Sequence, residues 1–309
     1  MLLIVNLNLA LDHVLHVDQL QPAGVHRATR SYTQAGGKGV NVARALKAFG
    51  VSAQVTGFLG GWRRATIQSS ARQEKIQLAA VPIRGDSRAC VILLDDRQHT
   101  STVINEPGPV ISQKEWEGWA TRYQRMLARA EAVLLTGSFP PGVPPAAARQ
   151  IVAWAKAAKK PVLVDTSGPA LAEALKAKPT VLKINQVEAE SLAGFPIKTV
   201  VDAQRAAVDF LRRGVIMPVI TMGRWGAVIT TRAGAYYFQA LTGMGWNDIG
   251  SGDALLAGVA AGFHQELPPV EIGPLAIAAA TASLTHGFGK ITADEVRRLT
   301  PHIRHKRLE

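Results

Sequence analysis

Short apolar runs alternate with helical segments through the middle of the chain, and this rhythm limits the fold more than any other feature. The runs lie at residues 132–136, 162–165, 181–184 and 219–221, and helices are predicted at 144–158, after 168, after 188 and at 201–213. Runs that are mostly apolar are typical of strands covered on both faces, and strands that alternate with helices favour a parallel sheet. The predicted fold class is therefore α/β, a doubly wound, mostly parallel sheet with helices on both faces.

Two pairs of extended segments lie outside this rhythm. Residues 13–18 and 27–33 alternate in polarity around a Pro-Ala-Gly turn, and residues 87–94 and 100–105 flank two aspartates. Such patterns predict hairpins, and we expect both pairs to join in one small sheet. Apolar runs at 2–7 and 51–59 add two strands to the main body.

The composition fits a folded protein of a reducing cytoplasm. Hydrophobic residues make up 47% of the 309 residues, which argues against a disordered chain. Cys90 is the only cysteine, so no disulfide can form within the chain. The N-terminus lacks the basic region of a signal peptide, and the apolar helices predicted at 254–263 and 275–285 are interpreted as core. We therefore expect a cytoplasmic location and no membrane partner.

The formal net charge of +12 does not by itself indicate a nucleic-acid partner. The Lys and Arg residues are scattered, and the one dense cluster, at residues 304–307, is predicted to be a solvated tail. An anionic small substrate, or a composition rich in arginine, accounts for the charge equally well. We therefore expect no nucleic-acid partner.

The strongest candidate for a catalytic site is a glycine turn that feeds an apolar helix at residues 247–263. Gly250, Ser251 and Gly252 leave room for an anion to approach the backbone, where the first N–H groups of a helix carry partial positive charge. Asp253 is expected in the first helical turn, where its carboxylate can accept the proton of an attacking alcohol. An ordinary helix cap explains the same residues, so this stretch alone leaves both interpretations open.

A second glycine turn, at residues 36–39, opens another predicted helix. Its backbone amides can face a ligand, and Asn41 lies one turn into the helix, within reach of a sugar hydroxyl. The spacing is not that of a Walker loop. Asp12 follows the first strand, and other polar residues follow later strands, at the carboxyl ends where ligands bind in open α/β sheets.

Together these motifs resemble the PfkB-type carbohydrate kinases of the ribokinase superfamily. Residues 36–43 match the first family signature and residues 250–253 match the second, in the expected order. Further matches lie at 105–109, 137–142, 165–168 and 185–188. The resemblance covers nearly the whole chain and implies one ribokinase-like domain, 1–309, with a lid formed by two insertions at about 12–35 and 87–106. The sequences of these motifs are most similar to those of the phosphosugar branch of the family, which includes 1-phosphofructokinase and tagatose-6-phosphate kinase.

The resemblance implies a role for each matching position. Asp253 would be the general base, and the amides of Gly250, Ser251 and Gly252 would form the anion hole. The implied sugar-binding residues are Asp12, Gly36, Gly37, Lys38, Asn41 and Ser138. The implied nucleotide-binding residues are Asn185, Thr221, Gly223, Gly226, Gly250 and Gly252. ATP with Mg²⁺ would be the phosphoryl donor, Asn185 and Glu188 would hold the metal mostly through water, and a homodimer formed through the lid fits the resemblance.

The sequence therefore predicts an ATP-dependent kinase of a phosphorylated ketohexose: fructose 1-phosphate, tagatose 6-phosphate or fructose 6-phosphate. Arg27 and Arg88, expected on the lid, are candidates to hold the substrate phosphate. The alternative is that they are ordinary surface arginines that only keep the protein soluble. One alternative is a kinase of a free sugar or nucleoside on the same fold. Another is a non-catalytic sugar or nucleotide sensor, against which the retained Asp253 argues.

Three places depart from the family pattern. Asp248 stands where the family usually has Thr or Ser, and Ile184 replaces a common proline. Trp62-Arg63-Arg64 follows Gly60-Gly61, where small residues are usual. The last departure leaves the details of substrate binding open.

Overall fold

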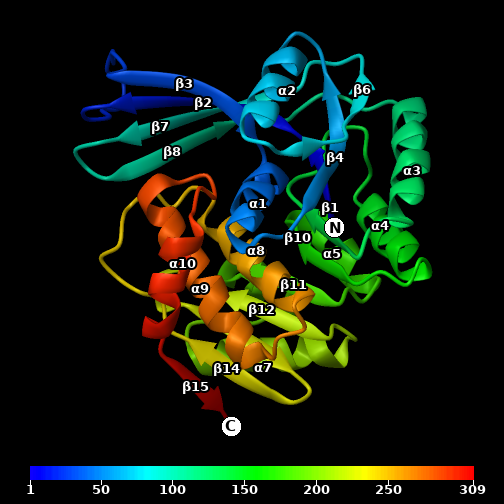
Figure 1. Cartoon of the computed structure of the whole chain (residues 1–309), viewed down its shortest axis with the longest axis vertical. Coiled ribbons are helices and arrows are strands. Elements are labelled where there is room, and N and C mark those ends of the chain that lie inside the picture. The colour runs from blue at the N-terminus through cyan, green and yellow to red at the C-terminus, as the bar shows by residue number, and fades with distance from the viewer.

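The computed structural model describes residues 1–309 and contains two β-sheets (Figure 1). The main sheet has eleven strands, in the order β15-β14-β13-β12-β11-β10-β9-β1-β4-β5, with β6 paired to β4. These strands are β1 (Leu2–Asn8), β4 (Ala53–Gly60), β5 (Gln77–Leu78), β6 (Val81–Ile83), β9 (Ala132–Thr136), β10 (Val162–Asp165), β11 (Val181–Asn185), β12 (Met217–Thr221), β13 (Ala227–Thr231), β14 (Gly234–Phe238) and β15 (His305–Leu308). Pairing is parallel from β5 through β12, which confirms the predicted mostly parallel sheet.

The antiparallel strands at the β15 edge of the main sheet were not predicted from the sequence. Strands β12 to β15 pair antiparallel, and β15 adds the C-terminal segment to that edge, with Phe238 opposite His305 and Ala235 opposite Leu308. The prediction of a solvated tail holds for the exposed side chains of residues 304–307. It is wrong for the backbone, because the unpaired edge of β14 offers N–H and C=O groups that this segment satisfies.

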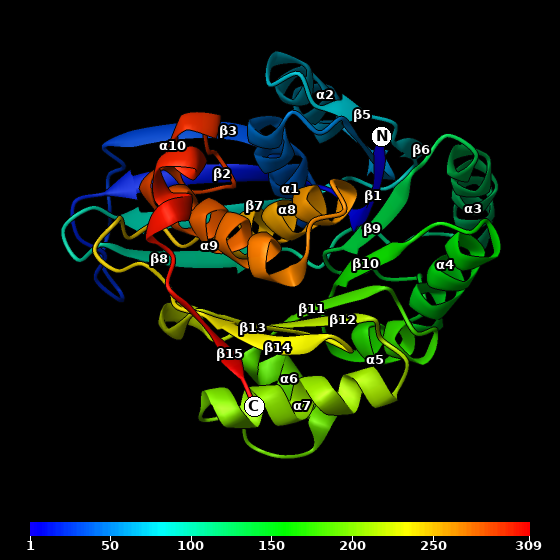
Figure 2. The ribbon, with the colours of Figure 1, turned by 60° about the horizontal axis from the view of Figure 1, so that its bottom comes forward.

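Helices cover both faces of the main sheet, as predicted (Figure 2). One face carries α1 (Lys38–Leu46), α2 (Arg63–Gln73), α8 (Ser251–His264), α9 (Pro269–His286) and α10 (Ala293–Leu299). The other face carries α3 (Gln113–Leu127), α4 (Ala146–Ala157), α5 (Gly168–Lys176), α6 (Gln186–Ala193) and α7 (Val200–Arg212). Each layer has its own hydrophobic core, and no helix has the length and apolar character that a membrane span needs.

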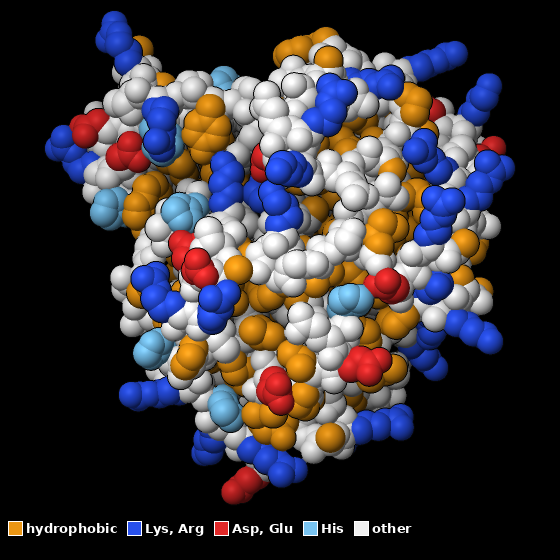
Figure 3. All heavy atoms as spheres, viewed as in Figure 1, with side chains coloured by type: hydrophobic (Ala, Val, Ile, Leu, Met, Phe, Trp, Pro, Cys, Tyr) orange, Lys and Arg blue, Asp and Glu red, His pale blue; other side chains and the backbone are white.

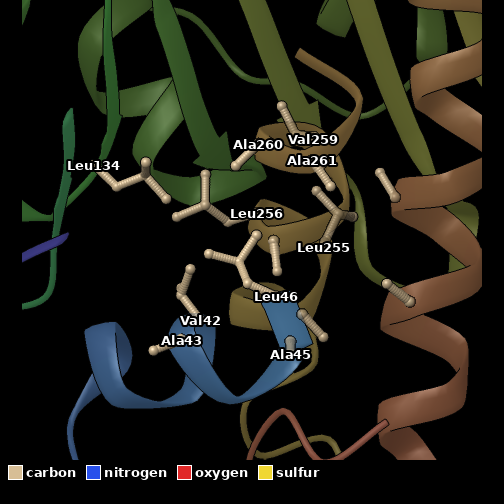
Figure 4. Close-up of a cluster of buried hydrophobic side chains, with 14 of the residues drawn as sticks. Val42, Ala43, Ala45, Leu46, Leu134, Leu255, Leu256, Val259, Ala260 and Ala261 are labelled. Atoms are coloured by element: carbon tan, nitrogen blue, oxygen red, sulfur yellow. The ribbon is translucent and has the colours of Figure 1, made fainter. Parts of the chain in front are cut away.

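The contact between α1 and α8 positions the two glycine turns. Val42 and Leu46 of α1 pack toward Leu256 of α8 in the buried cluster of Figure 4. Small residues let α8 approach its neighbours closely, since a Cβ on Gly258 would lie 2.6 Å from the Cα of Ala276 in α9. The two helices therefore form a packed unit that holds their N-terminal ends in a fixed relation.

The small sheet consists of β2 (Ala10–Val17), β3 (Arg30–Gly36), β7 (Arg88–Asp95) and β8 (Thr100–Asn105) and projects from the body (Figure 1). Both expected pairs are antiparallel, and β2 pairs with β7 in parallel, so the predicted single small sheet is confirmed. The predicted strand at residues 27–33 begins too early. Arg27 lies exposed in the loop before β3, because pairing with β2 begins only at Arg30, opposite His16.

Candidate active site

A cavity of about 840 Å³ lies between the small sheet and the carboxyl ends of the central parallel strands. Its lining includes most of the residues that were predicted to bind the sugar or to act on it: Asp12, Gly37, Lys38, Asn41, Arg88, Ser138, Gly250 and Asp253. We call this the substrate cavity. Segments from both ends of the chain thus meet where open α/β sheets bind their ligands.

Asp253 lies in the first turn of α8, and its side chain is held from α1. Gly250 caps the helix at φ 79°, and a Cβ there would lie 2.7 Å from the backbone N of Gly289, so this position requires glycine. Asn41 Nδ2 donates to Asp253 Oδ2 at 2.8 Å, and Arg44 Nη1 donates to Asn41 Oδ1 at 2.8 Å. Arg44 therefore orients the amide of Asn41 so that its N–H groups face the carboxylate.

The environment of Asp253 suits a proton acceptor. The residue is 5% exposed, and burial raises the pKa of its carboxyl above the ordinary value, while the nearby ammonium of Lys38 opposes this effect. A general base works best when its pKa is near the operating pH. Burial therefore moves this carboxylate in the direction that proton abstraction needs.

An ionic triad centred on the buried Asp165, which the sequence reasoning missed, lies beside the glycine turn. Asp165, at the end of β10, is bound by Lys38 Nζ and Lys183 Nζ, each at 3.1 Å. Burial acts to raise the pKa of Asp165, but Lys183 and Lys38 together bring it below the ordinary value, and Asp165 in turn raises the pKa of Lys38. A Cβ on Gly252 would lie 3.2 Å from Lys183 Nζ, so the triad brings an ammonium to the glycine turn.

The triad had a weak signal in the sequence. Asp165 lies within a segment that matches the family, and Lys183 lies within a predicted strand that is otherwise apolar. A lysine inside an otherwise apolar buried strand needs a carboxylate partner. That pattern would have predicted a buried pair, but not which aspartate completes it.

A second cavity, of about 450 Å³, lies on the other side of the same turn and is called the apolar cavity here. It is lined by Gly223, Gly226 and Asp248, by Ser251 and Gly252 of the turn, and by apolar side chains that include Leu241, Leu255, Ile277 and Leu284. Gly250 and Asp253 line the substrate cavity, whereas Ser251 and Gly252 line the apolar one. The turn therefore separates the two spaces, as expected for transfer of a group from one to the other.

Asp12 and Gly36 form a close contact on the small-sheet side of the substrate cavity. A Cβ on Gly36 would lie 1.9 Å from Asp12 Oδ1, so Gly36 makes room for the carboxylate without lining the cavity. Burial raises the pKa of Asp12 to about 7. Because burial removes water from this carboxylate, a hydrogen bond donated by a ligand hydroxyl would stabilise its charged form.

Arg88 is the cation of the substrate cavity that has no carboxylate partner. Its Nε donates to the Asn8 carbonyl at 3.2 Å, and no ion pair is formed with it. Asn8 Nδ2 donates to Ser138 Oγ at 3.1 Å, while its buried Oδ1 has no partner. Asn8 was not among the predicted site residues, although it ends the first strand. Arg88, Ser138 and Asn8 together offer groups for a polar, anionic ligand.

Other predicted residues lie away from these cavities. Arg27 is not brought to the substrate cavity, because its loop is exposed beyond the end of β3. Asn185 and Glu188 line neither cavity and form a capping box at the start of α6, with each side chain accepting from the other residue's backbone N–H at 2.9 Å. Thr221 also lines neither cavity, and lies opposite Asn185 in the β11–β12 register.

The three departures from the family pattern have structural explanations. Asp248 Oδ1 accepts a hydrogen bond from Ser101 Oγ of β8 at 3.0 Å, which links the apolar cavity to the small sheet. Arg63, the first residue of α2, pairs with Glu106 at 3.4 Å, so it supports the rim of the substrate cavity without lining it. Ile184 is fully buried in the core on the α3–α7 face.

Comparison with known proteins identifies the family. The model of the "pfkB family carbohydrate kinase" matches residues 3–293. The chain belongs to the pfkB family of carbohydrate kinases. This membership confirms the resemblance inferred from the two glycine signatures, and it makes the protein a phosphotransferase that acts on carbohydrates.

Individual members of the pfkB family are similar over most or all of the chain. The 1-phosphofructokinase of Bacillus subtilis is 30% identical over 309 residues, 100% of each chain. A tagatose-6-phosphate kinase of Staphylococcus epidermidis is 31% identical over 270 residues, 86% of each chain. The solved structure of a Thermotoga maritima protein named as a possible 1-phosphofructokinase superposes with a TM-score of 0.91 at 25% identity, covering 100% of both chains.

Proposed function

We propose that this pfkB-family kinase transfers the γ-phosphoryl group of ATP to a hydroxyl of a phosphorylated ketohexose: fructose 1-phosphate, tagatose 6-phosphate or fructose 6-phosphate. The observation that carries the proposal is that one cavity contains both the buried carboxylate of Asp253 and the guanidinium of Arg88, which has no ion-pair partner. The names of the relatives support the same class of substrate. A coupled ADP-release assay across these three esters and their free sugars tests it.

The residues divide the work of the reaction between them. Asp253 accepts the proton of the acceptor hydroxyl as its oxygen bonds to the γ-phosphorus and the bond to the leaving ADP oxygen breaks. The N–H groups at Gly250, Ser251 and Gly252, together with Lys183, stabilise the charge on the transferred group. The apolar cavity provides a surface for the adenine base, beside Gly223 and Gly226.

Mg²⁺, when bound with ATP, neutralises the phosphate charge that would otherwise oppose transfer. No group of three or more His, Cys, Asp or Glu side chains is arranged to hold a metal ion in this structure. This fits an ion held mainly by nucleotide phosphates and water, which is the usual preference of Mg²⁺. Glu188, close enough to contribute to the raised pKa of Lys38, remains our proposed outer ligand together with Asn185.

Glu188→Gln is expected to raise the Mg²⁺ concentration needed for half-maximal activity by roughly 10–100-fold, the range for loss of an outer-shell ligand. Glutamine also forms capping boxes, so α6 should keep its start. A Mg²⁺ titration at fixed ATP measures the shift, with Glu271→Gln, an exposed residue of α9, as the matched control. An unchanged Mg²⁺ response in Glu188→Gln would remove the residue from the metal site.

Arg88→Ala is expected to lower kcat/KM for the phosphosugar on the order of 10–150-fold, the range for losing a hydrogen bond to a charged group. The loss should lie mainly in KM, because the substrate's own phosphate is bound alike in ground and transition states. Steady-state kinetics with the ester and the matching free sugar measure it. Arg97→Ala, a change in the turn between β7 and β8 at an exposed ion pair, is the control.

The Arg88 experiment also separates the alternatives. Equal losses on ester and free sugar would move the assignment to a free-sugar or nucleoside kinase. Absence of turnover on every sugar, with ligand binding retained, would favour a sensor. Selective loss on the ester supports the proposed substrate class.

We also propose that the small sheet, with insertions at about 12–35 and 87–106, is a lid on one domain of 309 residues and a dimer contact. Ile104 of β8 is 57% exposed, and Leu15 and Leu93 stand half-buried opposite each other on the same face, away from the substrate cavity. Partly uncovered apolar groups on a sheet are typical of an interaction surface.

The single free cysteine, Cys90, supports a cytoplasmic location.

A further inference from the structure

A third cavity, of about 620 Å³, lies where the outer half of the small sheet meets the body. The small sheet contributes Arg30 and Tyr32, and the body contributes Trp246 and Lys290. In Figure 3 an indentation separates the small sheet, at the upper left, from the body, and Lys, Arg and His side chains lie around it. Its volume is within the range of small-molecule sites. We call it the outer cavity.

The outer cavity is separate from the substrate cavity but lies along the same face of the small sheet. Asp12 and His16 are four residues apart on β2, so their side chains share one face. Asp12 lines the substrate cavity and His16 the outer one. Between them an apolar cluster that includes Val14, Ile92 and Phe288 closes the space. No residue lines both cavities.

The outer cavity is lined by the basic side chains of Arg30 and Lys290, by two histidines, His16 and His286, and by one carboxylate, Asp96, which is already engaged. Asp96 Oδ1 lies 2.9 Å from His16 Nδ1, and Arg30 Nη2 lies 2.6 Å from His16 Nε2. Neither Arg30 nor Lys290 forms an ion pair. Lys290 Nζ instead lies 5.6 Å from the ring centroid of Tyr32. Both cations thus line the hollow without a direct ion pair, although the Asp96 carboxylate lines it too.

The environment of Lys290 disfavours its positive charge. Burial lowers the pKa of Lys290, and the positive charges of Arg44 and Arg30 lower it further, while Glu74 opposes them. Like charges that share a partly buried space repel each other, and a bound anion relieves the repulsion. The site is therefore prepared for negative charge rather than for a neutral ligand.

We propose that the outer cavity binds a small phosphate ester. The planar fork of Arg30 suits two phosphate oxygens, and Lys290 adds a point charge from the opposite wall. Tyr32 and Trp246 give the carbon part of the ester an apolar surface. Arg30 belongs to the small sheet and Lys290 to the body, so an ester held by both ties the two parts together.

Occupancy of the outer cavity should alter binding in the substrate cavity. Asp12 and Arg88 reach the substrate cavity from the same small sheet that carries Arg30. Fixing that sheet against the body should lower KM for the sugar, and by linkage the sugar should strengthen binding of the ester. This consequence rests on the proposed kinase function, whereas binding of the ester does not.

The test measures binding of inorganic phosphate and of glycerol 3-phosphate by calorimetry, without turnover. All proteins carry Arg88→Ala, which removes the substrate-cavity cation for phosphate. The Arg30→Gln/Lys290→Gln pair should weaken binding of glycerol 3-phosphate on the order of 10-fold or more. The control pair Arg97→Gln/Lys306→Gln removes the same charge from exposed positions and should leave binding unchanged.

Fluorescence provides an independent readout, because Trp246 lines the cavity. Glycerol 3-phosphate should change the emission of the protein, and Trp246→Phe should abolish that change. Equal affinity in the Arg30/Lys290 pair and its control would overturn the proposal, as would no saturable binding up to about 10 mM. Binding of inorganic phosphate as tight as that of the ester would overturn the assignment of an ester.

Discussion

Asp253→Asn is expected to lower kcat by about 10²–10⁴-fold, the usual contribution of a positioned general base. Asparagine has nearly the shape of aspartate and can still accept the hydrogen bond from Asn41 Nδ2, so the site should remain folded. It cannot take the proton of the attacking hydroxyl. KM for sugar and nucleotide should change little, because proton transfer belongs to the transition state.

Steady-state kinetics and calorimetric substrate binding on the same Asp253→Asn preparation separate catalysis from affinity. Ser251→Ala is the matched control in the same turn, because the backbone N–H that forms the anion hole remains. Its kcat should stay well above that of Asp253→Asn. Wild-type turnover in a folded Asp253→Asn enzyme would exclude the residue as the base.

The dependence of kcat and kcat/KM on pH should reflect the raised pKa values of the buried carboxyls. A base must be deprotonated to act, and burial raises the pKa of Asp253, so activity should fall as pH decreases through a value above that of an ordinary aspartate. Asp12, whose pKa is raised to about 7, lines the same cavity and contributes to the acid limb of kcat/KM. The apparent values then belong to the two carboxyls together.

Asp165→Asn is expected to lower the free energy of unfolding by roughly 3–5 kcal/mol, the range for breaking a buried ion pair by removing one partner. Asp165 is fully buried, and Lys183 is 5% exposed, so the substitution leaves an ammonium in the interior without its countercharge. Urea unfolding at neutral pH measures the loss. Asp18→Asn, which breaks the exposed pair with Arg97, should change stability little.

The stability effect of Asp165 should depend on pH with a defined sign. Its pKa is lower in the folded protein than in the unfolded chain, so the folded state holds fewer protons between these two values. The stabilisation is therefore fully present above the unfolded pKa of roughly 4, and it is lost as pH falls toward the folded value. Equal stability of wild type and Asp165→Asn at neutral pH would show that the triad contributes nothing to folding.

Local patterns in the sequence predicted the fold class and the small sheet, which the structure confirms, and pointed to the glycine turn at Asp253. Strands that are covered on both faces are mostly apolar, so the alternation of apolar runs with helices after residue 132 predicted the layered sheet. Glycines at a helix start can mark an anion site from neighbouring residues alone, so the turn before Asp253 was a candidate site, and the family resemblance then implied the role of Asp253. Asn41 was found in the same way, from its position one turn after Gly37.

Tertiary structure decided the features that depend on strand order and register. Asp165 ends β10 and Lys183 lies in the middle of the adjacent strand β11, and their pairing follows from the order β10–β11, which spacing along the chain does not reveal. Arg88 lines the substrate cavity and Arg27 does not, because pairing with β2 begins at Arg30. The antiparallel edge and the outer cavity also depend on residues far apart in sequence. Such contacts depend on how the helices and strands pack against each other, and short patterns in the sequence do not predict that packing.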